Sequence, residues 1–308
     1  MRAAVCQCRG TGFRPAQPEL SVRNSVALLV SVIATLLALG LAVLVDDGAY
    51  RVAGLPLLVA LALFGFAVQW LVFVPSFLRQ TEHFYDLTGA LTYASVILLA
   101  AGFSSPDARG WVIAALVLIW CGRLGSFLFL RVRRSGKDGR FDDLKPHWPR
   151  FFMAWTLQGL WGFLTLLAAL VAVSSPASVG WDVWATLGLV IWAGGFAIEA
   201  VADQQKTAFK ADPANDGRFI RHGLWAWSRH PNYFGEIVLW TGIAVMAVPA
   251  MIGWQWLGWL SPLFVCWLLM KVSGIPLLEQ RADETWGGQA DYEAYKAATP
   301  VLVPRPPR

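Results

Sequence analysis

The connection that spans residues 195–240 carries many polar side chains in a chain that is otherwise apolar. Arginine has a planar guanidinium that suits phosphate groups, and the amino terminus of a helix favours a nearby anion. This set is typical of a site for an anionic ligand, with topology-setting positive charge as the alternative interpretation. The amide and carboxylates among the cations favour the ligand site. The polar residues are Asp203, Lys206, Lys210, Arg218, Arg221, Arg229, His230, Asn232 and Glu236.

The end of this connection has the pattern of a helix that enters a membrane. Pro231 fits the first turn of a helix, because proline has a fixed φ and no N–H to leave unpaired. Arg229 and His230 would then lie at the positive helix terminus. Asn232 and Glu236 are spaced i, i+4, so they would share one helix face just inside the bilayer. Polar groups at that depth usually serve a ligand or a partner.

Charged residues also lie near or within two other apolar segments. Asp203, Lys206 and Lys210 are spaced i, i+3 and i+7, so they would share one face at the end of a helix. Arg123 lies inside an apolar segment, where a cation is costly unless it faces the bundle, water or an anion. Snorkelling of Arg123 toward the membrane surface is the alternative.

The composition indicates a polytopic membrane protein. Of the 308 residues, 56% are hydrophobic and only 15% are charged. The net charge is +5, but the cations are dispersed among connections, so we expect no nucleic-acid partner. The sequence has neither a glycine-rich dinucleotide turn after a strand nor a phosphate-binding loop. No cysteine pair has the spacing of a metal site, and we predict no bound metal.

Apolar segments of about 20 residues predict an all-α fold with about seven to eight transmembrane helices. Arginine and lysine gather in alternate connections, so eight crossings would place both termini in the cytoplasm, whereas seven would separate them. We expect residues 1–24 to form a disordered cytoplasmic tail and residues 25–308 to form a single membrane domain. The segments are 25–45, 55–78, 87–103, 110–131, 151–173, 182–201, 233–250 and 254–274.

Two strings, DQQKTAFKADP and GLWAWSRHPNYFGE, resemble the membrane sterol double-bond reductases and the steroid 5α-reductases, through the bacterial branch of that superfamily. The resemblance covers roughly the C-terminal half of the chain. It implies an NADPH-dependent reductase that acts on a carbon–carbon double bond of a steroid-like or other lipid enone. It also implies a bacterial inner-membrane protein whose residues 110–308 carry a cofactor pocket facing the cytoplasm. We expect a monomer whose partners are membrane lipids and this lipid-soluble substrate.

The resemblance further implies which side chains bind the cofactor. Glu199 stands where an Asn is expected and Gly217 where a Tyr is expected. These two departures affect the inference about the substrate more than the inference about the cofactor. Glu279 and Tyr295 belong to a C-terminal tail typical of the superfamily, although an amphipathic surface helix is the alternative for that tail. Topology-setting charge is likewise the alternative for the arginines of the loop after residue 130. The implied set is Arg123, Arg131, Asp203, Lys206, Lys210, Arg218, Trp225, Arg229, His230, Asn232, Tyr233, Glu236, Glu279 and Tyr295.

The proton donor of such a reduction has to come from other positions. In steroid 5α-reductases a Glu and a Tyr serve the substrate carbonyl, but Phe73 and Trp120 occupy those positions here and neither can donate a proton in that role. Asp86 is the predicted acid, assisted by Tyr85 or Tyr93, with Glu236 also assigned to the catalytic set. Glu82 is a further candidate, for which a hydrated turn at the membrane surface is the alternative.

Two other functions remain open on the sequence alone. The isoprenylcysteine methyltransferases, which bind S-adenosylmethionine, share the RHPxY string and a tyrosine-containing tail. Asn232 and the DQQK string are closer to the reductases. A non-catalytic sterol-binding or scaffold protein is the third interpretation, because Trp120 departs from the catalytic pattern.

Overall fold

The computed structural model describes residues 17–135 and 138–307 and consists almost entirely of helices. Eight segments of this described part are long and apolar enough to cross a membrane. The predicted all-α, multi-pass architecture is therefore confirmed. The segments are Ser21–Val45, Leu57–Leu78, Tyr85–Ser104, Ala108–Leu130, Trp148–Val173, Val183–Ala211, Pro231–Ala250 and Gly253–Trp286.

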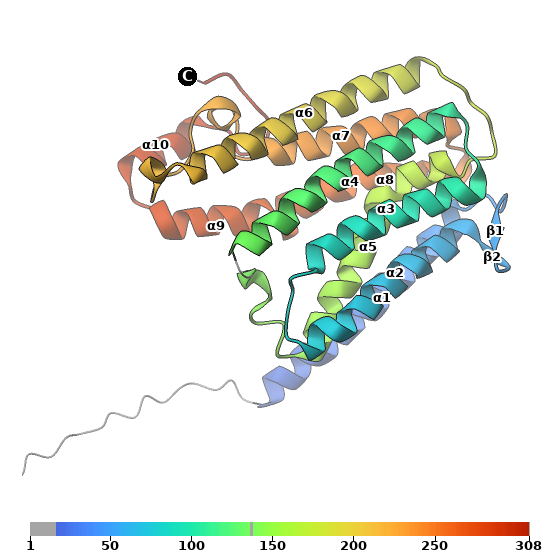
Figure 1. Ribbon diagram of the computed structural model, residues 1–308, viewed down its shortest axis with the longest axis horizontal. Helices are drawn as coiled ribbons and strands as arrows, with labels where there is room; N and C mark the ends of the chain where they lie inside the picture. The colour runs from blue at the N-terminus through green and yellow to red at the C-terminus, as the bar shows by residue number, and fades with distance from the viewer. Residues whose placement is uncertain (1–16, 136–137, 308) are drawn as a thin grey trace, which may run out of the picture.

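Most helices follow one another through short connections, whereas residues 212–230 separate α6 from α7 (Figure 1). A two-stranded antiparallel hairpin, with positive φ at both turn residues Ala53 and Gly54, joins the first two. The last crossing is composite, because a π-helix at Leu268–Val272 interrupts it. In order, the main elements are α1 Gln17–Val45, β1 Arg51–Val52, β2 Leu55–Pro56, α2 Leu57–Leu78, α3 Tyr85–Ser104, α4 Ala108–Ser135, α5 Trp148–Val173, α6 Val183–Ala211, α7 Pro231–Ala247, α8 Leu260–Trp267, α9 Ile275–Trp286 and α10 Ala290–Ala298.

The first helix begins earlier than the sequence analysis expected. Residues 17–24, which we assigned to a disordered tail, belong to α1. Pro18 lies in its first turn, where proline needs no N–H partner. Residues 1–16 of the predicted tail lie outside the described part of the chain.

Helix α5 forms the centre of the bundle and packs against α1, α2, α3, α4, α7 and α8 (Figure 1). Its most hydrophobic stretch is 83% buried, compared with 28% for that of α1. Trp155, Leu166 and Leu167 are among its fully buried side chains. α5 therefore provides the surface against which α3, α4 and α7 pack.

Helices α6 and α7 approach each other backbone to backbone through glycine. A methyl group on Gly195 of α6 would lie 2.5 Å from the Leu239 nitrogen of α7. One on Gly235 of α7 would lie 2.6 Å from the Glu199 nitrogen of α6. Small residues allow membrane helices to pack this closely. Because Glu199 and Glu236 lie beside this contact, the glycines set the distance between the polar groups of the two helices.

The two ends of the bundle differ in character. The start of α1, helices α9 and α10, and the C-terminus lie at one end, and the β1–β2 hairpin lies at the other (Figure 1). This placement of both chain ends agrees with an even number of crossings. The cytoplasmic location of that end stays a prediction from the positive charge.

At the hairpin end, Arg109 of α4 is buried and joins three segments. Its side chain is 2% exposed and lies 2.6 Å from an Asp182 carboxylate oxygen before α6. The guanidinium also donates to the carbonyls of Gly180 and Met246, at 2.9 and 3.1 Å. Arg109 thus fastens the loop before α6 to the end of α7.

Replacing Arg109 with methionine should lower the stability of the protein by about 2 kcal/mol or more, because the buried Met246 carbonyl loses a charge-assisted hydrogen bond. Thermal unfolding of the purified protein in detergent measures the effect. Arg51→Met is the matched control, since Arg51 is exposed at the same end and bonds only the nearby Gly54 carbonyl. Equal unfolding temperatures for the two variants would contradict the assignment.

Candidate functional site

A cavity of about 230 Å³ lies between α3, α4, α5, α6 and α7. Its walls combine aromatic rings with carboxyl, amide and hydroxyl groups. The structure therefore brings seven of the predicted site residues together from three helices. They are Tyr85, Asp86 and Tyr93 of α3, Asp203 of α6, and Asn232, Tyr233 and Glu236 of α7.

The polar side of this cavity is built around Arg123 of α4. Its guanidinium pairs with the Glu199 carboxylate and, at 2.9 Å, with the Asp203 carboxylate. Asn232 Nδ2 donates to Asp203 at 3.2 Å. Arg123 therefore faces the bundle and meets anions there rather than snorkelling to the surface. The guanidinium thus joins α4 to α6, and the hydrogen bond from Asn232 to Asp203 joins α7 to α6.

Glu236 lies one helical turn after Asn232 on the same cavity wall. It is 9% exposed, and no hydrogen bond or ion pair from another described residue occupies its carboxyl group. Three carboxyl groups therefore share this buried region with the single guanidinium of Arg123.

Aromatic rings also line the cavity. Tyr93 and Trp120 pack edge to face with ring centroids 5.2 Å apart, and Trp120 meets Trp240 at 4.9 Å. Tyr93 Oη and Trp120 Nε1 are buried without a hydrogen-bond partner among the described residues. Buried polar atoms of this kind normally find a partner, so a bound molecule could satisfy them.

Asp86 also lines the cavity and lies 3.8 Å from the guanidinium of Arg140. This contact with a cation distinguishes Asp86 from Glu236, for which the described structure shows no ion pair. Tyr85 Oη donates to the Ala154 carbonyl at 3.0 Å. Of the two predicted assistants, Tyr93 therefore keeps its hydroxyl available and Tyr85 uses it within the protein.

Glu82 has a structural role at the loop before α3. Its carboxylate lies 2.6 Å from Lys145 Nζ and accepts a hydrogen bond from the Asp138 N–H at 2.8 Å. Burial tends to raise the pKa of Glu82, but the hydrogen bonds from Lys145 and Asp138 lower it below the usual value. The ionised Glu82 thus fastens the α4–α5 loop to α3.

A second polar cluster adjoins the cavity before α7, which begins at Pro231 as predicted. Glu279 pairs with Arg229 and with His230 Nε2, each at 2.6 Å. The His230 ring stacks on Tyr233 with centroids 5.8 Å apart. Because Tyr233 lines the cavity, this stack connects the cavity to the cluster.

The two remaining aromatic residues of the predicted site, Trp225 and Tyr295, contact each other before α7. Lys206 Nζ lies 4.4 Å from the Trp225 ring centroid. Trp225 Nε1 donates to the Ala202 carbonyl at 3.0 Å, and Tyr295 Oη donates to the Trp225 carbonyl at 2.8 Å. These contacts fix the loop before α7 to α6 and α10.

Three predicted cofactor residues stand apart from both groups. Lys210 and Arg218 are exposed and have no ion pair within the ranges that the structure describes. Arg131 belongs to α4, but its side chain lies outside the described part of the structure. The predicted set thus separates into a cavity, an adjoining cluster and exposed cations.

Glu199, Gln158 and Trp161 also line the cavity, although none of them belongs to the predicted set of site residues. Glu199 is 2% exposed, four residues before Asp203 on α6. A second carboxylate at i, i+4 inside an apolar helix was the signal that could have identified it. Gln158 and Trp161 carry no comparable signal, because single polar or aromatic residues are common in such helices.

Burial lowers the pKa of His230, although hydrogen bonding to Glu279 opposes this shift. The folded protein therefore binds a proton at His230 less readily than the unfolded chain, in which the pKa of a histidine is about 6.5. Stability should be full above that pH and fall as the pH drops below it. Thermal unfolding from pH 7.5 to 5.5 should show this loss, and His230→Gln should reduce its slope. An unchanged slope would contradict the role of His230.

The family described as Protein of unknown function (DUF1295) matches residues 72–299, which is more than half of the chain, and the chain therefore belongs to this family. An uncharacterized protein of Schizosaccharomyces pombe is 26% identical over 212 residues, covering 59% of this chain and 62% of the relative. Steroid 5-alpha-reductase DET2 of Gossypium hirsutum is 35% identical over 117 residues, covering 38% of this chain and 40% of that protein.

The chain thus spans less than two thirds of the length of either curated relative. No solved structure matches it. The predicted relationship to steroid 5α-reductases is supported as a distant, partial similarity.

Proposed function

We propose that this DUF1295 protein is an NADPH-dependent reductase of a carbon–carbon double bond in a lipid-soluble enone. The observation that carries the proposal is a cavity between the membrane helices that is lined by both aromatic rings and polar side chains. An apolar substrate can enter such a site from the bilayer, and a few polar groups can then fix its orientation. The partial similarity to a steroid 5-alpha-reductase supports the same reaction class.

Unused polar atoms test whether the site fits the cofactor. Asn232 Oδ1, Glu199 Oε2 and Arg123 Nε are buried without partners in the described structure. They would hold the amide-bearing end of the dinucleotide, while exposed Lys210 and Arg218 would meet its phosphates. The residues present therefore fit the group. NADPH would supply the hydride of the reduction.

The protein itself must supply the proton, because reduction of an enone adds one hydride and one proton across the double bond. Glu236 is the carboxyl group in the cavity without a cation of its own, since Arg123 already pairs with Glu199 and Asp203. Asp86 lies near Arg140 instead. We therefore assign the acid to Glu236, with the free hydroxyl of Tyr93 positioned to orient the substrate carbonyl. Asp86 stays the alternative acid that the sequence favours.

Cofactor binding tests the proposal before any substrate is known. The purified full-length protein should bind NADPH more tightly than NADH, because exposed cations can hold the additional phosphate. Arg218→Gln should reduce this preference by roughly two- to five-fold, as the loss of one solvent-exposed charge pair allows. Fluorescence titration of the reduced cofactors measures both effects. Equal affinity for NADH and NADPH, or preferential binding of S-adenosylmethionine, would contradict the proposal.

A further inference from the structure

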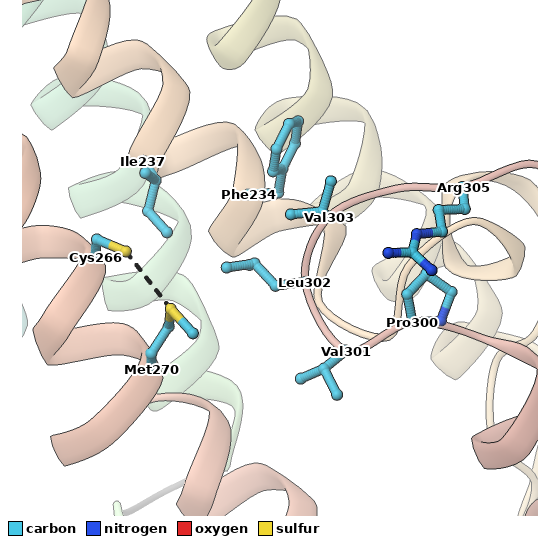
Figure 2. A pocket seen from close by; sticks show the side chains of 9 residues that line it. All are labelled: Phe234, Ile237, Cys266, Met270, Pro300, Val301, Leu302, Val303 and Arg305. Carbon is cyan, nitrogen blue, oxygen red and sulfur yellow. Dashed lines mark hydrogen bonds between the residues drawn. The ribbon is translucent and has the colours of Figure 1, made fainter.

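A second hollow lies beside the candidate site, in a different place from the cavity. It has a volume of about 490 Å³ and lies between α7, the last crossing and the C-terminal segment (Figure 2). We refer to it as the C-terminal groove. Its lining is apolar except at Arg305. The lining residues are Phe234, Ile237, Cys266, Met270, Pro300, Val301, Leu302, Val303 and Arg305.

The groove and the cavity use different faces of the same helices. On α7, Tyr233 and Glu236 line the cavity, whereas Phe234 and Ile237 line the groove. The last crossing divides in the same way between Leu269, which lines the cavity, and its neighbour Met270. A single layer of helix therefore separates the two hollows.

The charged and apolar residues of the groove lie at different distances from the polar ends of the helices. Phe234 lies in the first turn of α7, and Ile237 lies one turn deeper. Cys266 likewise lies one turn deeper than Met270 from the polar end of the last crossing, and its Sγ contacts Met270 Sδ at 3.5 Å. Figure 2 shows Arg305 on the C-terminal segment, at the opposite side of the groove from these sulfur atoms. The cation therefore lies at the interfacial end and the apolar side chains extend inward.

Arg305 is available for a ligand. Its side chain is exposed and forms no ion pair with any residue in the described ranges. Its backbone N–H, by contrast, is fixed to the Trp227 carbonyl at 2.9 Å. A guanidinium held at the membrane surface above an apolar groove is complementary to a phosphate that carries an acyl chain.

We propose that the C-terminal groove binds an anionic phospholipid, with an acyl chain between α7 and the last crossing and the headgroup phosphate at Arg305. This function is separate from the reduction and does not depend on it. A neutral enone has no use for Arg305, so the charge favours a phospholipid over the substrate as the occupant.

The bound lipid would also stabilise the cluster beside the candidate site. The C-terminal segment is held there by hydrogen bonds from the Arg229 N–H to the Pro300 carbonyl at 2.9 Å and from Ser228 Oγ to the Leu302 carbonyl at 2.8 Å. A lipid that packs on this segment therefore supports the residues just before α7. Binding to the folded state alone raises stability by mass action.

Native mass spectrometry of the full-length protein tests the proposal. The detergent-solubilised protein is titrated with dioleoylphosphatidylglycerol or dioleoylphosphatidylcholine, which differ in charge but share the same chains. Wild type should retain phosphatidylglycerol about five-fold more strongly, as one interfacial cation allows. Arg305→Gln should abolish that preference. Arg79→Gln, at an exposed position after α2, is the control and should keep it.

A second measurement locates the acyl chain without relying on a mutation in the core. Cys266 should be alkylated by a bilayer-permeable maleimide more slowly when phosphatidylglycerol is added, with Cys6, Cys8 and Cys121 replaced by serine. Glycerol phosphate, which has no chain, should give no protection. Retained preference in Arg305→Gln, absence of Cys266 protection, or protection by glycerol phosphate would each overturn the proposal.

Discussion

Glu236→Gln should lower turnover of an enone by about 10²- to 10⁴-fold, the usual contribution of a general acid, while NADPH binding changes little. Glutamine keeps the shape and hydrogen-bonding capacity of the side chain but has no carboxyl proton to give. The expectation rests on the position of Glu236 in the cavity, where Arg123 is already paired with two other carboxylates. Turnover by the purified variant, together with its affinity for NADPH, measures the effect.

Asp86→Asn is the comparison that separates the two candidate acids. Because Asp86 lies 3.8 Å from Arg140, whereas Glu236 has no ion pair in the described structure, the loss of Asp86 should slow turnover less than the loss of Glu236. The reverse order, with Asp86→Asn inactive and Glu236→Gln active, would assign the proton to Asp86 as the sequence favours. The reductase function would survive that result, but the account of Glu236 would be wrong.

Gly195→Ala should disrupt both stability and the site. A methyl group there would lie 2.5 Å from the Leu239 nitrogen and 2.6 Å from the Gly235 oxygen, so α6 and α7 must move apart. Overpacking of this kind costs about 1–3 kcal/mol, and here the opposing atoms are backbone that cannot rotate away. Separation of the helices would also carry Glu199 away from Glu236. We expect a lower unfolding temperature and the loss of most NADPH binding.

Gly194→Ala is the matched control for this substitution. The two glycines are neighbours on the same helix, but a methyl group on Gly194 would meet no atom within 4 Å. Alanine also has the higher helix propensity, so Gly194→Ala should leave stability unchanged or slightly higher. Similar losses in both variants would show that backbone freedom, rather than close packing, explains the requirement at Gly195.

The sequence predicts the architecture well because membrane crossing imposes a simple rule. A span must be long and apolar, and the eight predicted segments each overlap one of the eight candidate spans. The start of α7 can also be predicted from neighbouring residues alone, because proline favours the first turn of a helix and Pro231 lies there. The spacing of Asn232 and Glu236 likewise predicts a shared face, and both line the cavity.

The contacts between helices could not be obtained in the same way. Arg123 gives a clear signal of cost in an apolar segment, but its partners Glu199 and Asp203 are distant in sequence. Glu279 shows the same difficulty, because it pairs with Arg229 and His230 and does not line the cavity. Partner choice depends on helix packing, which the spacing of residues along one helix does not determine.

Transfer of deuterium from NADPH to an enone is the direct test of the proposed reductase activity. The purified protein is incubated with NADPH deuterated at the transferable position and a panel of 3-keto-4-ene steroids and smaller enones, and the products are analysed by mass spectrometry. We expect one deuterium at the β-carbon of a reduced enone. We expect no deuterium transfer by Asn232→Ala and Glu236→Gln variants that remain folded. Absence of deuterium from every enone in the panel, with a folded wild-type protein that binds NADPH, would contradict the proposed activity.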